Sequence, residues 1–568
     1  MLVAALASGL SAQSASKAGI HSIQPDALKE WLTYIASDEL QGRGTYTEGL
    51  GLAAGYIADH LRAWGVKPAG DNGTYFQTVK VNGVRTTSRS SVTVQVNGQT
   101  RRFTDGQGIV FPRNMGGSQT VTAERVEFVG YGLNIPAANH NDYASVDAKG
   151  KVVVWLGAQG PKTVGQESRR LLFARSRLAV EKGAVATIGP IVPQAFGRGG
   201  PPPADAPVSA ERGADTPAGP PAQPAAVRGG RGNVPDDGDF TTVQRYDQKV
   251  APAVTAQDEF FEFLFSGSAV RYAELKSKSA KQEPLPPFTL KGVTLTFVVD
   301  ADYTITRTRL TRNVVGIVEG SDPRLKSTYV GFGAHYDHTG YRDSAPVTRP
   351  GQTSPADPND RINNGADDDG SGTVALMALA RAFATGPKPK RSLLFVWHAG
   401  EESGLLGSRY NADFPVVPID SLVAFLNIDM IGRNRDNKES ESNTVYVVGS
   451  DRISTELHNL NEDANASLAK PLLMDYEMND PADPESIYTR SDHYSYAAKG
   501  IPIIFYYTGS HPDYHRPSDS VEKILFEKLA RITQLVYSTA QRVANLDHAP
   551  ARDNKGPRAV GKGIREKG

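Results

Sequence analysis

The second half of the chain alternates short apolar runs with longer segments of helical periodicity. The runs are rich in β-branched and aromatic residues, which is typical of buried strands. They read NVVGIVEG from Asn313, TYVGFGAH from Thr328, RSLLFVWHAG from Arg391, LVAFLNIDMIG from Leu422 and IPIIFYYTG from Ile501. Helical patterns occupy residues 371–386 and 520–545. This order predicts an α/β sandwich with a mixed, mostly parallel central sheet.

The first half of the chain has a helical part followed by a β-rich part. Residues 26–68 have helical periodicity, and Gly65 is a natural C-terminal stop. The apolar stripe of this segment is predicted to consist of Leu52, Tyr56, Ile57 and Leu61. From about Val92 to Leu295 the pattern changes to short β-type runs separated by turns, including a buried strand over residues 152–156.

Three segments lack the pattern of a folded core. Residues 194–238 are dominated by Pro, Gly, Ala and Arg, and residues 549–568 form a basic tail without periodicity. Such segments bury too little apolar surface to offset chain entropy, so both are predicted to be disordered. Residues 1–17 are apolar and rich in small residues, like the later part of a secretory signal peptide, with a plausible cleavage point near Ala12 or Ala15. We therefore expect an exported protein, secreted or periplasmic, with a disordered tail as the alternative interpretation of residues 1–17.

Composition excludes several classes of partner and site. Lys+Arg and Asp+Glu both number 62, so the formal net charge is zero and general attraction to nucleic acid is not expected. No run approaches the ~18 apolar residues of a membrane span, so no integral membrane segment is expected. The chain contains no cysteine, which excludes disulfides and thiolate ligands. Nothing in the pattern indicates an oligomeric state.

Acidic residues and histidines follow each predicted strand or open the helix between them. In chain order the segments are HYDH from His335, GADDDGSG from Gly365, Glu401 with Glu402, Asp429 in NIDMIG, and SHPDYHRPSD from Ser510. In open α/β sheets, ligands bind beyond the carboxyl ends of the strands. A set of imidazoles and carboxylates without thiolates favours zinc or a related divalent ion. The number of such residues suits two ions that share a carboxylate.

These segments, in this order, resemble the metal-site motifs of the di-zinc exopeptidase family, which includes bacterial secreted aminopeptidases and glutamate carboxypeptidases. The stretch ASDELQGRGTYTEG from Ala36 is also similar to the opening segment of that family, and residues 128–157 resemble its protease-associated domain. The resemblance covers most of residues 25–545. It implies a three-layer peptidase domain, residues 24–90 and 296–548, with a mainly-β protease-associated domain, residues 91–295, inserted into it.

The resemblance also implies a role for each site residue. One zinc would bind His335 and Asp429, and the other would bind Glu402 and His515. The bridging carboxylate would be Asp368, chosen among three consecutive aspartates.

The remaining roles concern proton transfer and positioning. Glu401 would act as the general base, and Asp337 would hold His335 through its other ring nitrogen. Tyr514 is a candidate donor to the oxyanion, with a packed aromatic residue as the equal alternative.

Other histidines and one loop are less directly indicated. His338, His398 and His511 are predicted to support the site or the fold rather than to bind metal. His493 suits the substrate pocket and a structural role equally. The Pro-rich loop of residues 339–364 emerges beside the site, where it can narrow the substrate pocket.

The sequence thus predicts a zinc-dependent aminopeptidase acting on peptides. A carboxypeptidase or dipeptidase on the same scaffold is the alternative, for which Arg433, Arg435 and Arg490 are scattered candidates to bind a C-terminal carboxylate. A non-catalytic binding protein is a remote third interpretation. Loss of metal ligands or of the general base would indicate it, and the sequence retains all of them.

Overall fold

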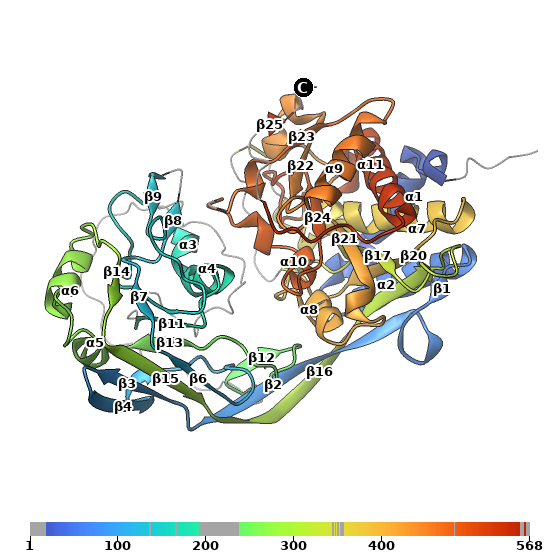
Figure 1. The fold of residues 1–568 in the computed structure, drawn as a ribbon. Coiled ribbons are helices and arrows are strands. Elements are labelled where there is room, and N and C mark those ends of the chain that lie inside the picture. The colour runs from blue at the N-terminus through green and yellow to red at the C-terminus, as the bar shows by residue number, and fades with distance from the viewer. Residues whose placement is uncertain are drawn as a thin grey trace, which may run out of the picture.

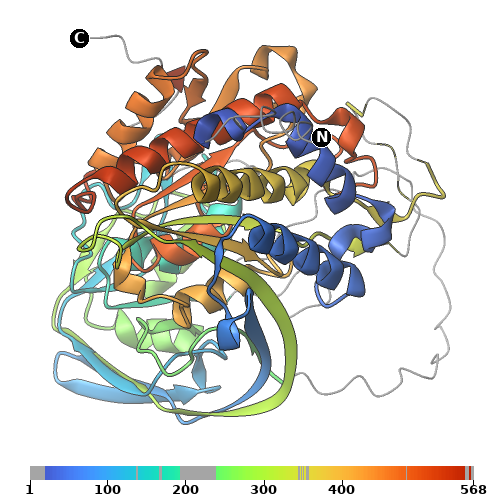
Figure 2. The same cartoon turned by 90° about the vertical axis from the view of Figure 1, so that its right-hand side faces the viewer.

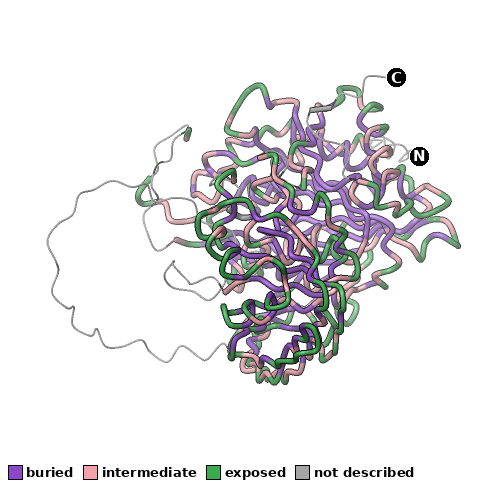
Figure 3. The backbone as a smooth tube through the Cα atoms, turned by 60° about the vertical axis from the view of Figure 1, so that its left-hand side comes forward, coloured by how far each residue is buried: buried purple, intermediate pink, exposed green. Residues whose placement is uncertain are grey.

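The computed structural model describes residues 19–135, 138–164, 169–191, 238–342, 346, 348, 351–352, 357–481, 483–556 and 562–563. The expected signal peptide lies outside the described residues, as does the Pro/Gly-rich insertion apart from Gly238. The described chain forms two lobes, one of helices around a sheet and one mainly of strands (Figure 1). Buried backbone runs through the interior of these lobes, and exposed backbone lies on their outer turns (Figure 3).

The first lobe is built on a mixed sheet whose centre is parallel. Neighbouring strands are, in order, β12 (Phe240–Thr242), β2 (Phe76–Ser88), β16 (Ala301–Val318), β20 (Ser392–His398), β17 (Tyr329–His335), β21 (Leu422–Ile428), β24 (Ile503–Tyr507), β22 (Thr444–Val448), β23 (Leu473–Asp475) and β25 (Lys562–Gly563). The four neighbouring strands β20, β17, β21 and β24 are parallel to one another. They are flanked by β16 and β22, which are antiparallel to them. The predicted mixed sheet is confirmed, with its parallel part confined to the centre.

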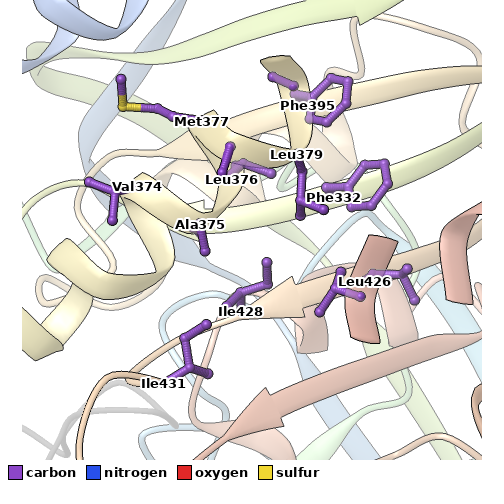
Figure 4. Packing of buried hydrophobic residues seen from close by; sticks show 14 of the residues in the cluster. Phe332, Val374, Ala375, Leu376, Met377, Leu379, Phe395, Leu426, Ile428 and Ile431 are labelled. Atoms are coloured by element: carbon purple, nitrogen blue, oxygen red, sulfur yellow. The ribbon is translucent and has the colours of Figure 1, made fainter. Parts of the chain in front are cut away.

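Helices cover both faces of this sheet and give three layers. One face packs against α1 (Pro25–Ile35), α2 (Glu48–Ala63), α7 (Gly372–Thr385), α9 (Thr455–Ala466) and α11 (Phe526–Asn545) (Figure 2). The other face packs against α10 (His493–Ala497), and α8 (Leu406–Asp413) lies beside it. Apolar side chains of α7, such as Leu376 and Leu379, lie over Phe332, Phe395 and Leu426 of the strands (Figure 4). The strands read as continuous apolar runs because both of their faces are covered.

The second lobe contains a separate sheet. Its strands, in order, are β14 (Phe288–Leu290), β7 (Val126–Phe128), β10 (Val152–Val154), β11 (Ala186–Pro190), β13 (Ala253–Ala256), β5 (Gly108–Val110), β4 (Gln99–Asp105), β3 (Ser91–Val96), β15 (Val293–Val299) and β6 (Gln119–Ala123). Short helices accompany it: α3 (Arg169–Phe173), α4 (Arg175–Glu181), α5 (Asp258–Leu264) and α6 (Tyr272–Ala280). All of these strands come from residues 91–299, and they have a core of their own.

A two-stranded antiparallel ribbon of β2 and β16 joins the lobes (Figure 1). The lobes meet again where the guanidinium of Arg177 in α4 lies 5.8 Å from the ring centroid of Tyr494 in α10. The second lobe therefore approaches the helix layer that lies next to the carboxyl ends of the central strands.

Two local predictions differ from the structure. On α2 the buried face consists of Leu50, Ala53, Ala54, Ile57, Ala58 and Leu61, whereas Leu52 is 46% exposed. Small alanines let this helix approach the sheet closely, so the larger residue points outward.

Residues 549–556 were predicted to belong to a disordered tail, yet the structure gives this segment defined contacts. The backbone N–H of Ala551 donates to Glu456 and that of Asn554 donates to Ile453. Such polar contacts need no apolar periodicity, which is why the pattern did not reveal them. Within the described residues, no helix combines the length and apolarity needed to cross a bilayer.

Candidate metal centre

The candidate site lies where the four parallel strands end. β17 ends at His335, β20 ends shortly before Glu401, β21 is followed by Asp429, and β24 is followed by the loop that carries His515. Because these strands are parallel, their carboxyl ends meet at one edge of the sheet. Asp368 reaches the same edge immediately before α7. Residues far apart in sequence are thereby brought together.

One group of potential ligands consists of His335, Asp368 and Asp429. Nε2 of His335 lies 3.2 Å from Oδ1 of Asp368 and 3.6 Å from Oδ1 of Asp429. His335 is buried, and the Asp429 carboxylate accepts a hydrogen bond from Oγ of Ser491 at 2.7 Å. This contact orients Asp429 toward the histidine.

A second group consists of His338, Asp368, Glu402 and His515. Nε2 of His515 lies 3.0 Å from Oδ2 of Asp368 and 3.0 Å from Oε2 of Glu402. Asp368 therefore presents Oδ1 to the first group and Oδ2 to the second. A carboxylate in this position can bridge two cations.

The atoms that face one another in these groups lack other partners. The buried atoms without a hydrogen-bond partner in the described structure include Nδ1 of His338, Oδ2 of Asp368, Oε1 of Glu402, Nε2 of His515 and Oδ1 of Asp429. Burying polar atoms unpaired is costly. A divalent cation in each group would satisfy them together, and nitrogen and oxygen donors without thiolates fit zinc.

The charges in the second group depend strongly on one another. Burial and Asp368 oppose ionisation of Glu402, yet His515 and His338 lower its pKa to about 2. Burial disfavours the charged His515, but Glu402 and Asp368 raise its pKa to about 10. The protein thus places a positive charge between these carboxylates. A zinc ion would take the place of that proton, because zinc binds neutral imidazole.

The other two aspartates of the GADDD segment point elsewhere. Oδ2 of Asp367 lies 3.3 Å from Nε2 of His511. Oδ1 of Asp367 accepts a hydrogen bond from the backbone N–H of Gly432. Asp369 accepts from the backbone N–H groups of Gly372 and Met430. Of the three consecutive carboxylates, Asp368 alone belongs to the groups described above.

The side chains of Glu401 and Glu402, which follow β20 in a turn, point to different parts of the site. Glu402 joins the second group, whereas Oε2 of Glu401 comes within 4.0 Å of Nε2 of His335. Burial raises the pKa of Glu401 well above its ordinary value, and Glu402 and Asp429 raise it further. A raised pKa suits Glu401 to exchanging a proton rather than to holding a fixed negative charge.

Asp337 contacts both His335 and Glu401. Nδ1 of His335 lies 3.1 Å from the backbone oxygen of Asp337 and 3.7 Å from its carboxylate. The carboxylate instead accepts hydrogen bonds from the backbone N–H of Glu401 and from Oγ1 of Thr45. Asp337 thus orients His335 through its main chain and Glu401 through its side chain.

A pocket opens beside the first group. Its lining includes four residues of the site, His335, Asp368, Glu401 and Asp429. The other lining residues are Met430, Ile487, Arg490, Ser491, Phe505, Tyr507 and Tyr514. Tyr514 stacks on His515 with ring centroids 3.9 Å apart. Burial raises the pKa of Tyr514 well above its ordinary value, so its hydroxyl stays protonated and can donate.

Two of the three candidate arginines are engaged away from this pocket. Arg433 donates to Asp513 at 3.1 Å, and Arg435 contacts Glu477. Arg490 lines the pocket and pairs with Glu485 at 3.1 Å. The described structure thus brings one of the three to the site.

Three histidines are buried outside both ligand groups. His398 lies 3.2 Å from Asp492, and its Nε2 is 2.9 Å from the hydroxyl of Tyr496. His511 pairs with Asp367 as described above. His493 stacks on Phe505, with its Nε2 2.8 Å from the backbone oxygen of Tyr488. It therefore lies behind the pocket wall.

The burial of His493 predicts a dependence of stability on pH. Burial lowers its pKa to about 3, whereas an unfolded histidine titrates near 6.5. Between these values the unfolded state binds one more proton, so stability is lost as pH falls below 6.5. We expect wild type to lose ~2 kcal/mol more than His493→Phe between pH 7.5 and 5. Thermal unfolding across this range checks it, and parallel profiles would contradict it.

Sequence reasoning did not assign a role to Arg43, which is fully buried behind the site. Its guanidinium donates to the backbone oxygens of Tyr336, Asn364 and Gly365. Burial lowers its pKa to about 10, so it remains charged at neutral pH and offsets the nearby carboxylates. The LQGRGT segment contained this residue, but nothing in its local pattern indicated a buried cation.

None of the described residues of the loop 339–364 lines the pocket. Gly340–Tyr341 pairs with Ile362–Asn363 as a short antiparallel ribbon. Nε2 of Gln352 donates to Oγ of Ser518 at 2.8 Å and to Asp513. The loop thus packs against the segment on both sides of His515.

Residues 313–540 match the family model of Peptidase family M28. A probable leucine aminopeptidase of Arthroderma benhamiae is 30% identical over 190 residues, which are 32% of this chain and 48% of that protein. A probable zinc metalloprotease of Pyrenophora teres f. teres is 37% identical over 123 residues, which are 22% of this chain and 23% of that protein. The chain thus spans about half of the length of the first of these curated relatives and less of the second.

Two solved structures align with most of the chain. An aminopeptidase from Aneurinibacillus sp. strain AM-1 is 18% identical, covering 95% of this chain and 99% of that one with a TM-score of 0.42. A zinc aminopeptidase from Bacillus subtilis is 17% identical, covering 94% and 99% with a TM-score of 0.41.

Proposed function

We propose that this protein is a zinc-dependent aminopeptidase that removes N-terminal residues from peptides, since residues 313–540 match the family model of Peptidase family M28. The observation that carries the proposal is the pair of ligand groups that share Asp368, with Glu401 beside them in a pocket. The leucine aminopeptidases among its curated relatives support the same activity.

The two groups have the donors for two zinc ions. His335 and Asp429 would hold one, Glu402 and His515 the other, and Asp368 would bridge them. Zinc ions held there would supply Lewis-acid chemistry, polarising the scissile carbonyl and making a water molecule more acidic.

Glu401 moves the proton in this proposal. Its carboxylate lines the pocket, is not part of either ligand group, and has a raised pKa. It can accept a proton from the attacking water and pass it to the leaving amine. Asp337 holds the backbone of Glu401 in place through its 3.1 Å hydrogen bond.

Tyr514 is placed to stabilise developing negative charge. Tyr514 lines the same pocket as Glu401, and its raised pKa keeps its hydroxyl protonated. A donor to an oxyanion contributes roughly 3 kcal/mol where it has been measured.

The pocket supports recognition of the amino end rather than the carboxyl end. Recognition of a C-terminal carboxylate favours converging arginines, and among the described lining residues Arg490 is the single arginine. Asp368 and Asp429 line the same space, where carboxylates attract a substrate ammonium. Met430, Ile487 and Phe505 offer apolar surface, so we propose an apolar first residue.

A panel of anilides tests this function. We expect leucyl anilide to be cleaved and its N-acetyl counterpart to react at least ~100-fold more slowly, which corresponds to ~2.7 kcal/mol. Acetylation removes the charge that the carboxylates attract and adds bulk where the pocket ends. Initial rates, with zinc content measured on the same sample, provide the check. Equal cleavage of both anilides, or reaction only with peptides that carry a free C-terminal carboxylate, would favour the carboxypeptidase alternative.

We also propose that the protein acts outside the cytoplasm. The support is the composition of residues 1–17, which resembles the later part of a signal peptide. N-terminal sequencing of the mature protein tests this.

A further inference from the structure

We propose that His338 is a fourth protein ligand in the group of Glu402, so that the two metal positions differ in kind. The proposal rests on the function proposed above. It concerns a histidine outside the set of ligands that the sequence motifs indicate, since a supporting role was expected for it.

The first support is the geometry of the ligand atoms. Nδ1 of His338 lies 2.8 Å from Oε1 of Glu402 and 3.7 Å from Oδ2 of Asp368. These separations resemble the 3.0 Å from Nε2 of His515 to each of the same carboxylates. The ligand atoms of all four residues lie within 4.8 Å of one another. Four nitrogen and oxygen donors so placed suit tetrahedral zinc.

The second support is the absence of another role for the imidazole. His338 is 1% exposed, and both of its ring nitrogens lack a hydrogen-bond partner in the described structure. Nδ1 of His338 and Oε1 of Glu402 lie 2.8 Å apart, and neither atom has a hydrogen-bond partner in the described structure. A histidine that merely held Glu402 in place would donate to it. A cation between the two atoms would satisfy both.

The third support is the rigid placement of the ring. The backbone N–H of His338 donates to the backbone oxygen of Arg43 at 3.1 Å. A Cβ at Gly365 would lie 2.6 Å from the ring of His338, so only glycine leaves room for the imidazole there. The fold thus fixes the ring beside Glu402 and Asp368.

The two positions would then have different tasks. His335, Asp368 and Asp429 line the pocket, whereas His338, Glu402 and His515 are not among its lining residues. A four-ligand site is typical of tightly held zinc, and a three-ligand site leaves a coordination position open. We infer a tightly bound ion at the His338 position and a more exchangeable ion facing the substrate.

Zinc titration of the metal-free full-length protein tests the first consequence. We expect two classes of site in wild type. His338→Ala should weaken the tighter class by more than ~100-fold, beyond the ~10–100-fold typical when an outer partner of a ligand is lost. His515→Ala should affect the same class, and His335→Ala should affect the weaker one. Unchanged affinities in His338→Ala would overturn the proposal.

His338→Cys separates ligation from support. Nδ1 lies close to Cβ, and Zn–S bonds are ~0.2–0.3 Å longer than Zn–N bonds, so a thiolate can nearly reach the same position. The chain has no cysteine of its own. A thiolate-to-cobalt charge-transfer band in the cobalt-loaded variant can therefore come only from residue 338, and we expect that band.

The outcomes distinguish this proposal from the proposed function. One outcome is that His338→Ala loses zinc while cobalt-loaded His338→Cys shows no charge-transfer band. That result would overturn ligation by His338, because it is expected of a residue that only supports the other ligands. A wild-type protein that binds no divalent ion would overturn the zinc-peptidase function as well. A wild type that binds two ions and cleaves leucyl anilide, with His338→Ala unchanged in affinity, would overturn the His338 proposal alone.

Discussion

Glu401→Gln is expected to retain both zinc ions while kcat falls ~10³-fold, within the range for loss of a general acid–base group. The amide keeps the shape of the side chain but cannot accept the proton of the attacking water. Metal binding should persist because Glu401 belongs to neither ligand group. Single-turnover kinetics and metal analysis on one preparation provide the measurement.

Glu402→Ala is the matched control from the adjacent position. It should weaken zinc at the position of His515 and regain part of its activity when zinc is added. Equal loss of metal in the two variants would contradict the division of labour between these carboxylates.

Asp368→Ala should have the larger effect, because Asp368 alone presents an oxygen to each group. Both ions should be lost or strongly weakened, and kcat/KM should fall at least ~10⁴-fold, or ~5.4 kcal/mol. Metal content after dialysis and the rate of leucyl anilide cleavage measure this. Asp357→Ala, an exposed aspartate of the preceding loop, is the matched control for loss of one negative charge. If Asp368→Ala kept two tightly bound ions, the shared position of Asp368 would be wrong.

Much of the fold could be predicted because both the strands and the helices carry strong local patterns. The run from Leu422 to Ile428 is β-branched, aromatic and buried on both faces, and it forms β21 where predicted. The stripe on α2 was wrong at Leu52 because periodicity alone does not show which face meets the sheet. That choice depends on the alanines, which allow close packing against it.

The candidate site was predictable in its residue types and its order along the chain. A parallel strand delivers whatever follows it to the carboxyl edge of the sheet, so His335, Glu401 and Asp429 could be expected to converge before any coordinates were known. The absence of cysteine further restricted the donors to imidazole and carboxylate.

Atomic partners within the site required the tertiary structure. The resemblance selected Asp368 among three consecutive aspartates, but the contacts of Asp367 with His511 and of Asp368 with His515 were known only from the structure. The structure likewise shows that Nδ1 of His335 lies nearer to the backbone oxygen of Asp337 than to its carboxylate.

The sequence by itself therefore determined the class of fold, the edge at which the site forms and the chemistry of its donors. Local composition and periodicity act over a few residues and are sufficient for those properties. The tertiary structure decided that His338 faces Glu402 and that Arg43 lies behind the site. Those positions depend on the path of loops between elements, which is set by packing between residues hundreds of positions apart.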